Sequence, residues 1–231
     1  MATTKPKITL YVDIVSPFAY MAYYILRHDP VFANCDVKYI PIFLGGLMHK
    51  CGNTAPMNIK NKDKYISLER LRWSSAFSIP IATEMPPDFP ALTLPTMRAL
   101  AVLYEEGGGV DGDQSKLVAA LDALYAATWV ERRATHKVDV LRGVLGGVLG
   151  VEEAERVLQA STTTGKALLL KLTDSAFDAG AFGLPWMVCT NPGTGATEGF
   201  WGVDHLGQVA QFLDLPIPKT AGDKAGWRAL L

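Results

Sequence analysis

The sequence has little cysteine, with Cys35, Cys51 and Cys189 the three in 231 residues. An odd set with no close pair argues against a disulfide framework and against a closed zinc site. The four histidines show no His-Glu-x-x-His motif and no paired spacing. We therefore expect no metal site and a reducing compartment inside the cell, with cytoplasm, mitochondrion and peroxisome left open.

Long apolar runs and charge of one sign are also missing. No stretch approaches the ~20 apolar residues that a membrane-spanning helix needs, and the first seven residues are too short and polar for a signal peptide. With 22 basic and 23 acidic residues, the formal net charge is −1. No overall field then attracts nucleic acid or an anionic membrane. We expect neither a membrane span nor a nucleic-acid partner; small neutral or modestly anionic partners fit better.

Motifs for nucleotide binding and for hydrolysis are incomplete. Residues 107–112 carry the glycines of a dinucleotide-binding loop, but they follow a helical pattern rather than a strand. Gly165 and Lys166 lack the upstream glycine and the hydroxyl of a P-loop. Ser16 is not in a Gly-x-Ser-x-Gly elbow, and no motif ties a histidine to it. Nucleotide chemistry and a hydrolase triad are therefore unsupported.

Hydrophobic residues make up 49% of the chain, enough for the core of one large domain or two entangled ones. Residues 8–14 are rich in β-branched and aromatic types, which predicts a strand. The strand runs into Ser16-Pro17, a helix start with proline in the first turn. Asp29-Pro30 ends that helix, and residues 37–42 predict a second strand. The chain thus opens with a βαβ unit.

The middle of the chain has a different pattern. From residue 43 to about 173, apolar residues recur at helical spacing without strand-like alternation. Strand character returns at 186–190, and turn residues then predict a hairpin with a second strand ending at Trp201. Asp204 is the predicted N-cap of a last amphipathic helix. Prolines and a polar tail beyond Leu215 predict a loose end.

Two local features could serve chemistry or structure alone. Ser16 lies where unpaired backbone N–H groups and the positive end of a helix dipole favour an anion, although a serine there can simply cap the helix. Leu184-Pro185 begins a strand, where proline does not break the hydrogen-bond ladder. If this peptide bond is cis, the preceding backbone can pair with a peptide-like ligand.

Five motifs occur in order along nearly the whole chain: DIVSPFAY at 13–20, GGLM at 45–48, GN at 52–53, GAFGLP at 180–185 and GVDH at 202–205. This pattern resembles the kappa-class glutathione transferases and their bacterial relatives, the 2-hydroxychromene-2-carboxylate isomerases. The resemblance implies that the two local features described above, Ser16 and Leu184-Pro185, bind a ligand.

The resemblance implies an α/β fold of the DsbA-like type, in which a thioredoxin-like domain (βαβ followed by ββα) is interrupted by an all-helical insertion. Residues 1–43 and 174–215 are the expected thioredoxin-like domain, 44–173 the insertion and 216–231 a C-terminal tail. Disulfide oxidoreductases of this superfamily open the first helix with Cys-x-x-Cys. Here residues 16–19 are Ser-Pro-Phe-Ala, so dithiol redox chemistry is excluded at that place. A homodimer is also implied.

A glutathione site is implied as well, with glutathione as co-substrate, and the positions that match the family's are Ser16, Pro17, Phe18, Asn53, Lys62, Leu184, Pro185, Val203 and Asp204. Ser16 is the expected catalytic residue, whose hydroxyl donates a hydrogen bond to the glutathione sulfur.

The other matching positions are expected to hold the tripeptide. The backbone of Leu184 pairs with its cysteinyl unit, and Lys62 meets its glycyl carboxylate. Asp204 receives its γ-glutamyl amino group. Val203 stands where the family often has a small polar residue, so one side-chain hydrogen bond is lost. On local sequence alone, Asn53 and Lys62 are a turn asparagine and a surface lysine.

The function implied is a glutathione transferase, in which the thiolate held at Ser16 attacks a small hydrophobic electrophile such as an aryl halide or a peroxide. Two alternatives stay open. One is a glutathione-dependent isomerase of the 2-hydroxychromene-2-carboxylate type, which uses the same sulfur and returns it. The other is a non-catalytic thioredoxin-like binding module without glutathione affinity.

Overall fold

The computed structural model describes residues 5–217, 227 and 230. Within them, the strands β1 (Lys7–Val12), β2 (Asp36–Pro41), β3 (Trp186–Thr190) and β4 (Thr197–Trp201) form one sheet in the order β2-β1-β3-β4. β1 pairs with β2 in parallel and with β3 antiparallel, and β3 pairs antiparallel with β4. The predicted βαβ unit and the C-terminal hairpin are both confirmed.

The sheet places the start of α1 (Pro17–His28) at the carboxyl end of its central strand. Ile8, Leu10 and Val12 of β1 are fully buried, which fits a strand covered by helices. Pro17 opens the helix, where its fixed φ suits a helix and its missing N–H costs no hydrogen bond. The helix ends at Asp29, as predicted.

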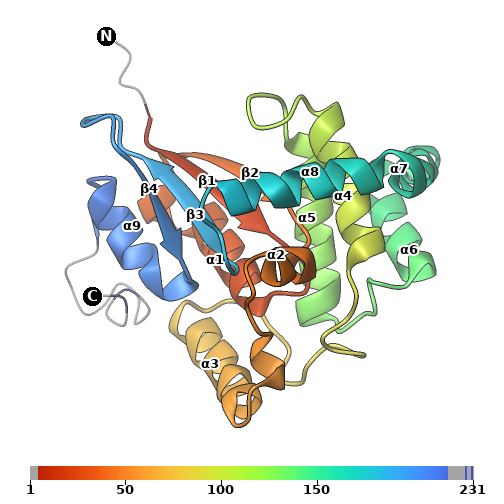
Figure 1. Ribbon diagram of the computed structural model, residues 1–231, viewed down its shortest axis with the longest axis horizontal. Coiled ribbons are helices and arrows are strands. Elements are labelled where there is room, and N and C mark those ends of the chain that lie inside the picture. The colour runs from red at the N-terminus through yellow and green to blue at the C-terminus, as the bar shows by residue number, and fades with distance from the viewer. Residues whose placement is uncertain (1–4, 218–226, 228–229, 231) are drawn as a thin grey trace.

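Helices fill the chain between β2 and β3. They are α2 (Leu44–Lys50), α3 (Lys62–Ala76), α4 (Leu94–Glu106), α5 (Ser115–Tyr125), α6 (Val138–Leu149), α7 (Val151–Thr163) and α8 (Gly165–Asp178), with a 3-10 turn at Pro56–Asn58 and a π-helical turn at Ala126–Val130. A further 3-10 turn, Pro30–Phe32, lies between α1 and β2. In Figure 1, α4 to α7 gather beside the β2 edge of the sheet. The predicted helical block is confirmed. The expected boundary between residues 173 and 174 falls inside α8, which runs through it without a break.

The chain closes with a 3-10 turn (Val203–His205) and α9 (Leu206–Phe212), which lies beside β4 through contact of Phe212 with Phe200 (Figure 1). The prediction that Asp204 is the N-cap of this helix is wrong. Gly202 has a φ of 97°, so the chain turns directly into the 3-10 helix and Asp204 falls within it. His205 occupies the N-cap instead.

Trp227 belongs to the segment predicted as a loose tail, yet its side chain is only 1% exposed. Its ring packs 5.8 Å from that of Phe32 and 5.9 Å from that of Phe77, centroid to centroid. Its Nε1 donates a hydrogen bond of 3.2 Å to Asp29. The prediction is wrong at this residue, because one large aromatic side chain gains more from burial than the polar composition of its neighbours suggests. Residues 218–226, 228–229 and 231 lie outside the described residues.

Two tryptophans of the hairpin lie against glycines. A Cβ at Gly199 would stand 2.4 Å from the ring of Trp186, and one at Gly183 would stand 2.8 Å from Nε1 of Trp201. Gly199 is in a strand, where glycine has no side chain to pack. Its presence there is explained by the indole that covers it.

We predict that Gly199→Ala lowers the free energy of unfolding by roughly 2 kcal/mol, since the added methyl overpacks a rigid ring. Gly146→Ala is the matched control. It lies within α6 with no atom within 4 Å of the added Cβ, so it raises stability by about 0.5–1 kcal/mol. Guanidinium unfolding curves of both variants measure the effects. Equal stability of Gly199→Ala and the parent chain would contradict the packing described.

Candidate active site

Ser16 occupies the N-cap of α1, as predicted. Its backbone is extended, with φ −88° and ψ 114°, and its Oγ accepts a hydrogen bond of 3.1 Å from the backbone N–H of Ala19. Within the described residues its hydroxyl donates no hydrogen bond. The cap therefore uses a lone pair of Oγ and leaves the hydroxyl proton free, at the positive end of a helix of 12 residues.

A buried carboxylate lies behind this serine. Asp13 is fully buried, and its carboxylate accepts hydrogen bonds from Val15 N–H at 3.1 Å, from the Thr93 hydroxyl at 2.8 Å and from Leu44 N–H at 2.8 Å. The backbone carbonyl of Asp13 accepts from Ser16 N–H at 3.1 Å. Asp13 thus joins the turn before α1 to the starts of α2 and α4. Burial raises the pKa of its carboxyl to about 6, although the three hydrogen bonds oppose the rise.

A second anchor holds the same turn. The indole of Trp129, which is 1% exposed, donates a hydrogen bond of 2.9 Å to the carbonyl of Ile14. The carbonyl of Trp129 in turn accepts from Ala82 N–H at 2.7 Å. The segment from Asp13 to Ser16 is therefore fixed by contacts from three separate parts of the chain, at Leu44, Thr93 and Trp129.

Leu184 and Pro185 lie beside the end of β1. Tyr11 pairs with Trp186, so the antiparallel register brings residues 184–185 next to the turn that leads to Ser16. The Leu184–Pro185 peptide bond is cis. Within the described residues, the backbone N–H and C=O of Leu184 make no hydrogen bond, whereas the carbonyl of Pro185 accepts from Gly202 N–H at 3.0 Å. A free donor and a free acceptor are thus available one residue before the proline.

Asn53 reaches the same region from the loop after α2. Its Nδ2 donates a hydrogen bond of 2.8 Å to the carbonyl of Phe182, two residues before Leu184. Gly52, with a φ of 67°, provides the turn that brings it there. Its Oδ1 accepts from its neighbour Thr54 N–H at 2.8 Å. Asn53 is thus placed to support the backbone of the Leu184 segment.

The remaining predicted residues are at different depths. Val203 is buried, so its side chain faces the core, and Asp204 is exposed next to it. Phe18 is half-buried beside Ser16. Lys62 begins α3 on the exposed surface, and within the described part of the chain its ammonium contacts none of the other predicted residues. The structure brings together every predicted residue except Lys62 by sheet register, chain neighbourhood or hydrogen bonds.

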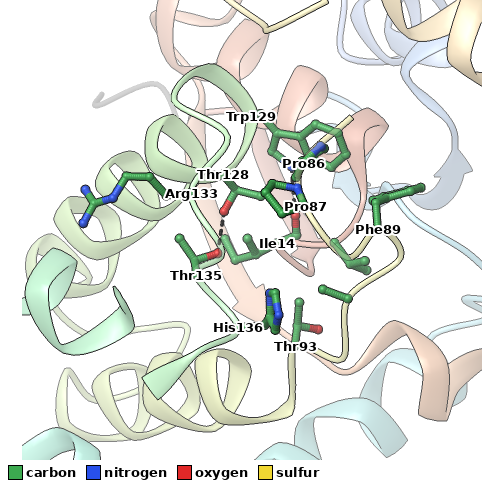
Figure 2. Close-up of a pocket in the computed structure, with 12 residues that line it drawn as sticks. Ile14, Pro86, Pro87, Phe89, Thr93, Thr128, Trp129, Arg133, Thr135 and His136 are labelled. Atoms are coloured by element: carbon green, nitrogen blue, oxygen red, sulfur yellow. Dashed lines mark hydrogen bonds between the residues drawn. The ribbon is translucent and has the colours of Figure 1, made fainter. Parts of the chain in front are cut away.

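A small hollow of about 20 Å³ opens against the turn before Ser16, lined by Ile14, Val15, Pro86, Pro87, Phe89, Ala91, Thr93, Thr128, Trp129, Arg133, Thr135 and His136 (Figure 2). This volume holds about one water molecule, which is far below the range for small-molecule sites, and the lining is mostly apolar. The hydroxyls of Thr128 and Thr135 lie 2.6 Å apart and satisfy each other.

The role of Asp13 and the walls of this hollow were missed by sequence reasoning. A carboxylate directly after an apolar strand and before a helix start is a signal for Asp13, because a charge in that position must be buried with partners. The walls come from residues 86–93 and 128–136, far from Ser16 in sequence. No local pattern connects these segments. In the described residues, no group of His, Cys, Asp and Glu could hold a metal ion, and no helix is both long and apolar enough to cross a membrane.

The raised pKa of Asp13 predicts a pH dependence of stability. An acid whose folded pKa is about 6, against 3.8 as its ordinary value, contributes stability that is full below about pH 4 and is lost as the pH rises through about 6. The free energy of unfolding of the parent chain minus that of Asp13→Asn should therefore fall between pH 4 and pH 7, by up to about 3 kcal/mol. Urea titrations at several pH values measure it. A difference that stays flat between pH 4 and pH 7 would contradict the account.

The chain is similar to proteins of known name over most of its length. A family model described as DSBA-like thioredoxin domain matches residues 7–214. The glutathione S-transferase kappa 1 of Caenorhabditis elegans is 25% identical over 224 residues, which cover 92% of this chain and 93% of the relative. The 2-hydroxychromene-2-carboxylate isomerase of Sphingobium xenophagum is 26% identical over 208 residues, which cover 89% and 97%.

A solved structure of a 2-hydroxychromene-2-carboxylate isomerase shows the same fold, with a TM-score of 0.70 at 21% identity over 90% of this chain and 94% of that one. The family model matches residues 7–214, which is most of the chain. The chain therefore belongs to the family of proteins with a DsbA-like thioredoxin domain.

Proposed function

We propose that this protein is a glutathione transferase of the kappa type, which binds glutathione at Ser16 and activates its thiol for attack on a small hydrophobic electrophile, such as an aryl halide or a peroxide. The observation that carries the proposal is the state of the Ser16 hydroxyl, which accepts the cap hydrogen bond and keeps its proton free to donate. The relatives named as glutathione transferases and isomerases support an enzyme that uses glutathione.

The free hydroxyl and the helix terminus act on the same sulfur. A free thiol has a pKa near 8.5, and each unit by which it falls corresponds to about 1.4 kcal/mol of preference for the thiolate. A hydrogen bond to a charged group contributes about 1.5–3 kcal/mol. One hydroxyl donor, together with the dipole of α1, is therefore enough to make thiolate a major form near neutral pH.

The tripeptide can be seated by groups already described. The unpaired backbone of Leu184 offers a donor and an acceptor to the cysteinyl unit, as a strand of one residue added to the sheet. The exposed carboxylate of Asp204 suits the γ-glutamyl amino group, and Lys62 suits the glycyl carboxylate. The half-buried side chains of Val15 and Phe18, on either side of Ser16-Pro17 in the chain, suit the hydrophobic part of the electrophile.

The isomerase reaction is a second candidate, favoured by the relatives of that name. It uses the same thiolate, which adds to an unsaturated aromatic acid and is released after bond rotation. Product analysis separates the two reactions, since only the transferase consumes glutathione.

The proposal also covers assembly and domain limits. We also propose that the protein is a homodimer. The exposed apolar side chains of Ile59, Tyr65 and Leu68 are the proposed contact surface. We keep 1–43 and 174–215 as the proposed thioredoxin-like domain and 44–173 as the proposed helical insertion, with α8 continuous across residue 173. A binding module without glutathione affinity is the remaining alternative.

We predict that Ser16→Ala lowers kcat/KM for conjugation of glutathione to chlorodinitrobenzene by about 10- to 100-fold while calorimetry shows glutathione still binding, because one charge-assisted hydrogen bond is lost. Ser16→Asp keeps a good helix cap but removes the donor, so it should be equally impaired and fully folded. Ser115→Ala, at the start of α5, is the matched control. Full activity of Ser16→Asp would end the proposal.

Lys62→Gln should weaken glutathione binding about fivefold, because an ion pair between an exposed lysine and a carboxylate contributes up to about 1 kcal/mol of binding free energy. The glycyl monoethyl ester of glutathione lacks that carboxylate and should bind the parent chain and the variant equally. Lys64→Gln, two residues further along α3, is the control. If the ester distinguishes the parent from Lys62→Gln, the carboxylate does not lie at Lys62.

A further inference from the structure

A second hollow lies at the far end of β1 from Ser16, and it has no part in the proposed function. Its volume is about 160 Å³. A cavity of about 150 Å³ can hold a molecule of the size of benzene. It is lined by Lys7, Thr9, Asp36, Lys38, Val110 and Asp111, none of which belongs to the proposed glutathione site. This hollow therefore has room for a small molecule that binds independently of glutathione.

The floor of this hollow is made by the parallel pairing of β1 and β2. Lys7 lies opposite Asp36, and Thr9 lies opposite Lys38. Because residues two apart in a strand point to the same face, these four side chains gather on one face of the sheet. Thr9, Asp36 and Lys38 are half-buried, and Lys7 is exposed. The strand register thus brings two ammonium groups, a carboxylate and a hydroxyl together.

The glycine-rich loop between α4 and α5 forms the wall of the hollow. Two of its glycines approach so closely that a Cβ at Gly112 would overlap the carbonyl oxygen of Gly107. Gln114, which is 7% exposed, ties this loop to β2, the edge strand of the sheet. Its side chain accepts from Tyr39 N–H at 2.9 Å and donates to the carbonyls of Tyr39 at 3.0 Å and Gly109 at 3.3 Å. The loop is therefore fixed against the sheet.

The charged side chains of the hollow are available to a ligand. Within the described part of the chain, the side chains of Lys7, Asp36 and Asp111 make no ion pair and no hydrogen bond. This holds although Lys7 and Asp36 are opposite neighbours of unlike charge. Lys38 donates one hydrogen bond of 3.2 Å, from Nζ to the carbonyl of Gly112, and an ammonium group has two further donors. Two positive and two negative groups thus line the same small space.

We propose that this hollow binds a small α-amino acid in its zwitterionic form, of the size of glycine or alanine. Lys7 and Lys38 hold the carboxylate, and the hydroxyl of Thr9 adds a donor to the same group. Asp36 and Asp111 accept hydrogen bonds from the ammonium group. A neutral zwitterion matches a lining with two charges of each sign. A simple anion or cation would instead meet two like charges, which weaken its binding.

NMR of the isotope-labelled intact chain tests the site with three probes: glycine, acetate, which lacks the ammonium group, and methylammonium, which lacks the carboxylate. Glycine should give saturable shifts of the backbone amides at 107–112 and at the starts of β1 and β2. It should bind about fivefold tighter than either other probe, because it forms ion pairs at both ends and an exposed ion pair contributes a factor of about this size. Acetate or methylammonium binding as tightly as glycine would overturn the inference, since the hollow would then be a site for a simple ion.

Two variants locate the binding in this hollow. Lys38→Gln and Asp36→Asn should each weaken glycine binding about fivefold, and their amide spectra show directly whether they fold. Lys171→Gln, on the exposed surface of α8, is the matched control and should bind glycine like the parent chain. Unchanged affinity in both hollow variants, or no saturable shift with glycine in the parent chain, would overturn the inference. None of these results depends on conjugation of glutathione, so the two proposals fail separately.

Discussion

The hydrogen bonds that fix residues 13–16 are the constraint on which the rest of the site depends. The carboxylate of Asp13 and the indole of Trp129 hold this turn, and Ser16 is placed at the start of α1 by it. The Oγ of Ser16 accepts the cap hydrogen bond through a lone pair, so its hydroxyl proton stays free. The serine can therefore donate a hydrogen bond to a group bound in front of the helix. A looser turn would lose this orientation, and a helix cap alone would not restore it.

The first turn of α1 begins with a serine and has no cysteine. This determines which group each part of the site supplies in the proposed reaction. Residues 16–19 contain no cysteine, so in the proposed reaction the nucleophilic sulfur is that of bound glutathione. The unpaired backbone of Leu184 is suited to a peptide, and the half-buried side chains of Val15 and Phe18 to its reaction partner. In the proposed site, the fold thus provides backbone groups for the peptide, a hydrogen-bond donor for its sulfur and apolar side chains for its reaction partner.

Much of the fold follows from local patterns in the sequence. The β-branched run before Ser16-Pro17, the helical spacing between the strands and the turn residues at 191–195 each specify one element, and the sheet confirms them. Asp204 and Trp227 were misjudged because a positive φ at Gly202 and a distant aromatic pocket decide their positions. Neither cause is visible in neighbouring residues.

The parts of the site that sequence did not predict are those made by tertiary contact. Ser16, Leu184 and Asn53 stand in short motifs, so their types and order could be read directly. Thr93 and Trp129 act on the turn from about 80 and 115 residues away, and their side chains are common core types. Only the packed chain shows that they hold the serine.

The central claim is that the hydroxyl of Ser16 stabilises a bound thiolate, and the pKa of that thiol tests it most directly. Glutathione labelled with carbon-13 at the cysteinyl β-carbon reports the ionisation of its sulfur by NMR across a pH titration. The account predicts a pKa at least about one unit below the free value of ~8.5 in complex with the parent chain, and a return toward that value in Ser16→Ala. A bound thiol with an unshifted pKa, or one lowered equally in both proteins, would contradict it.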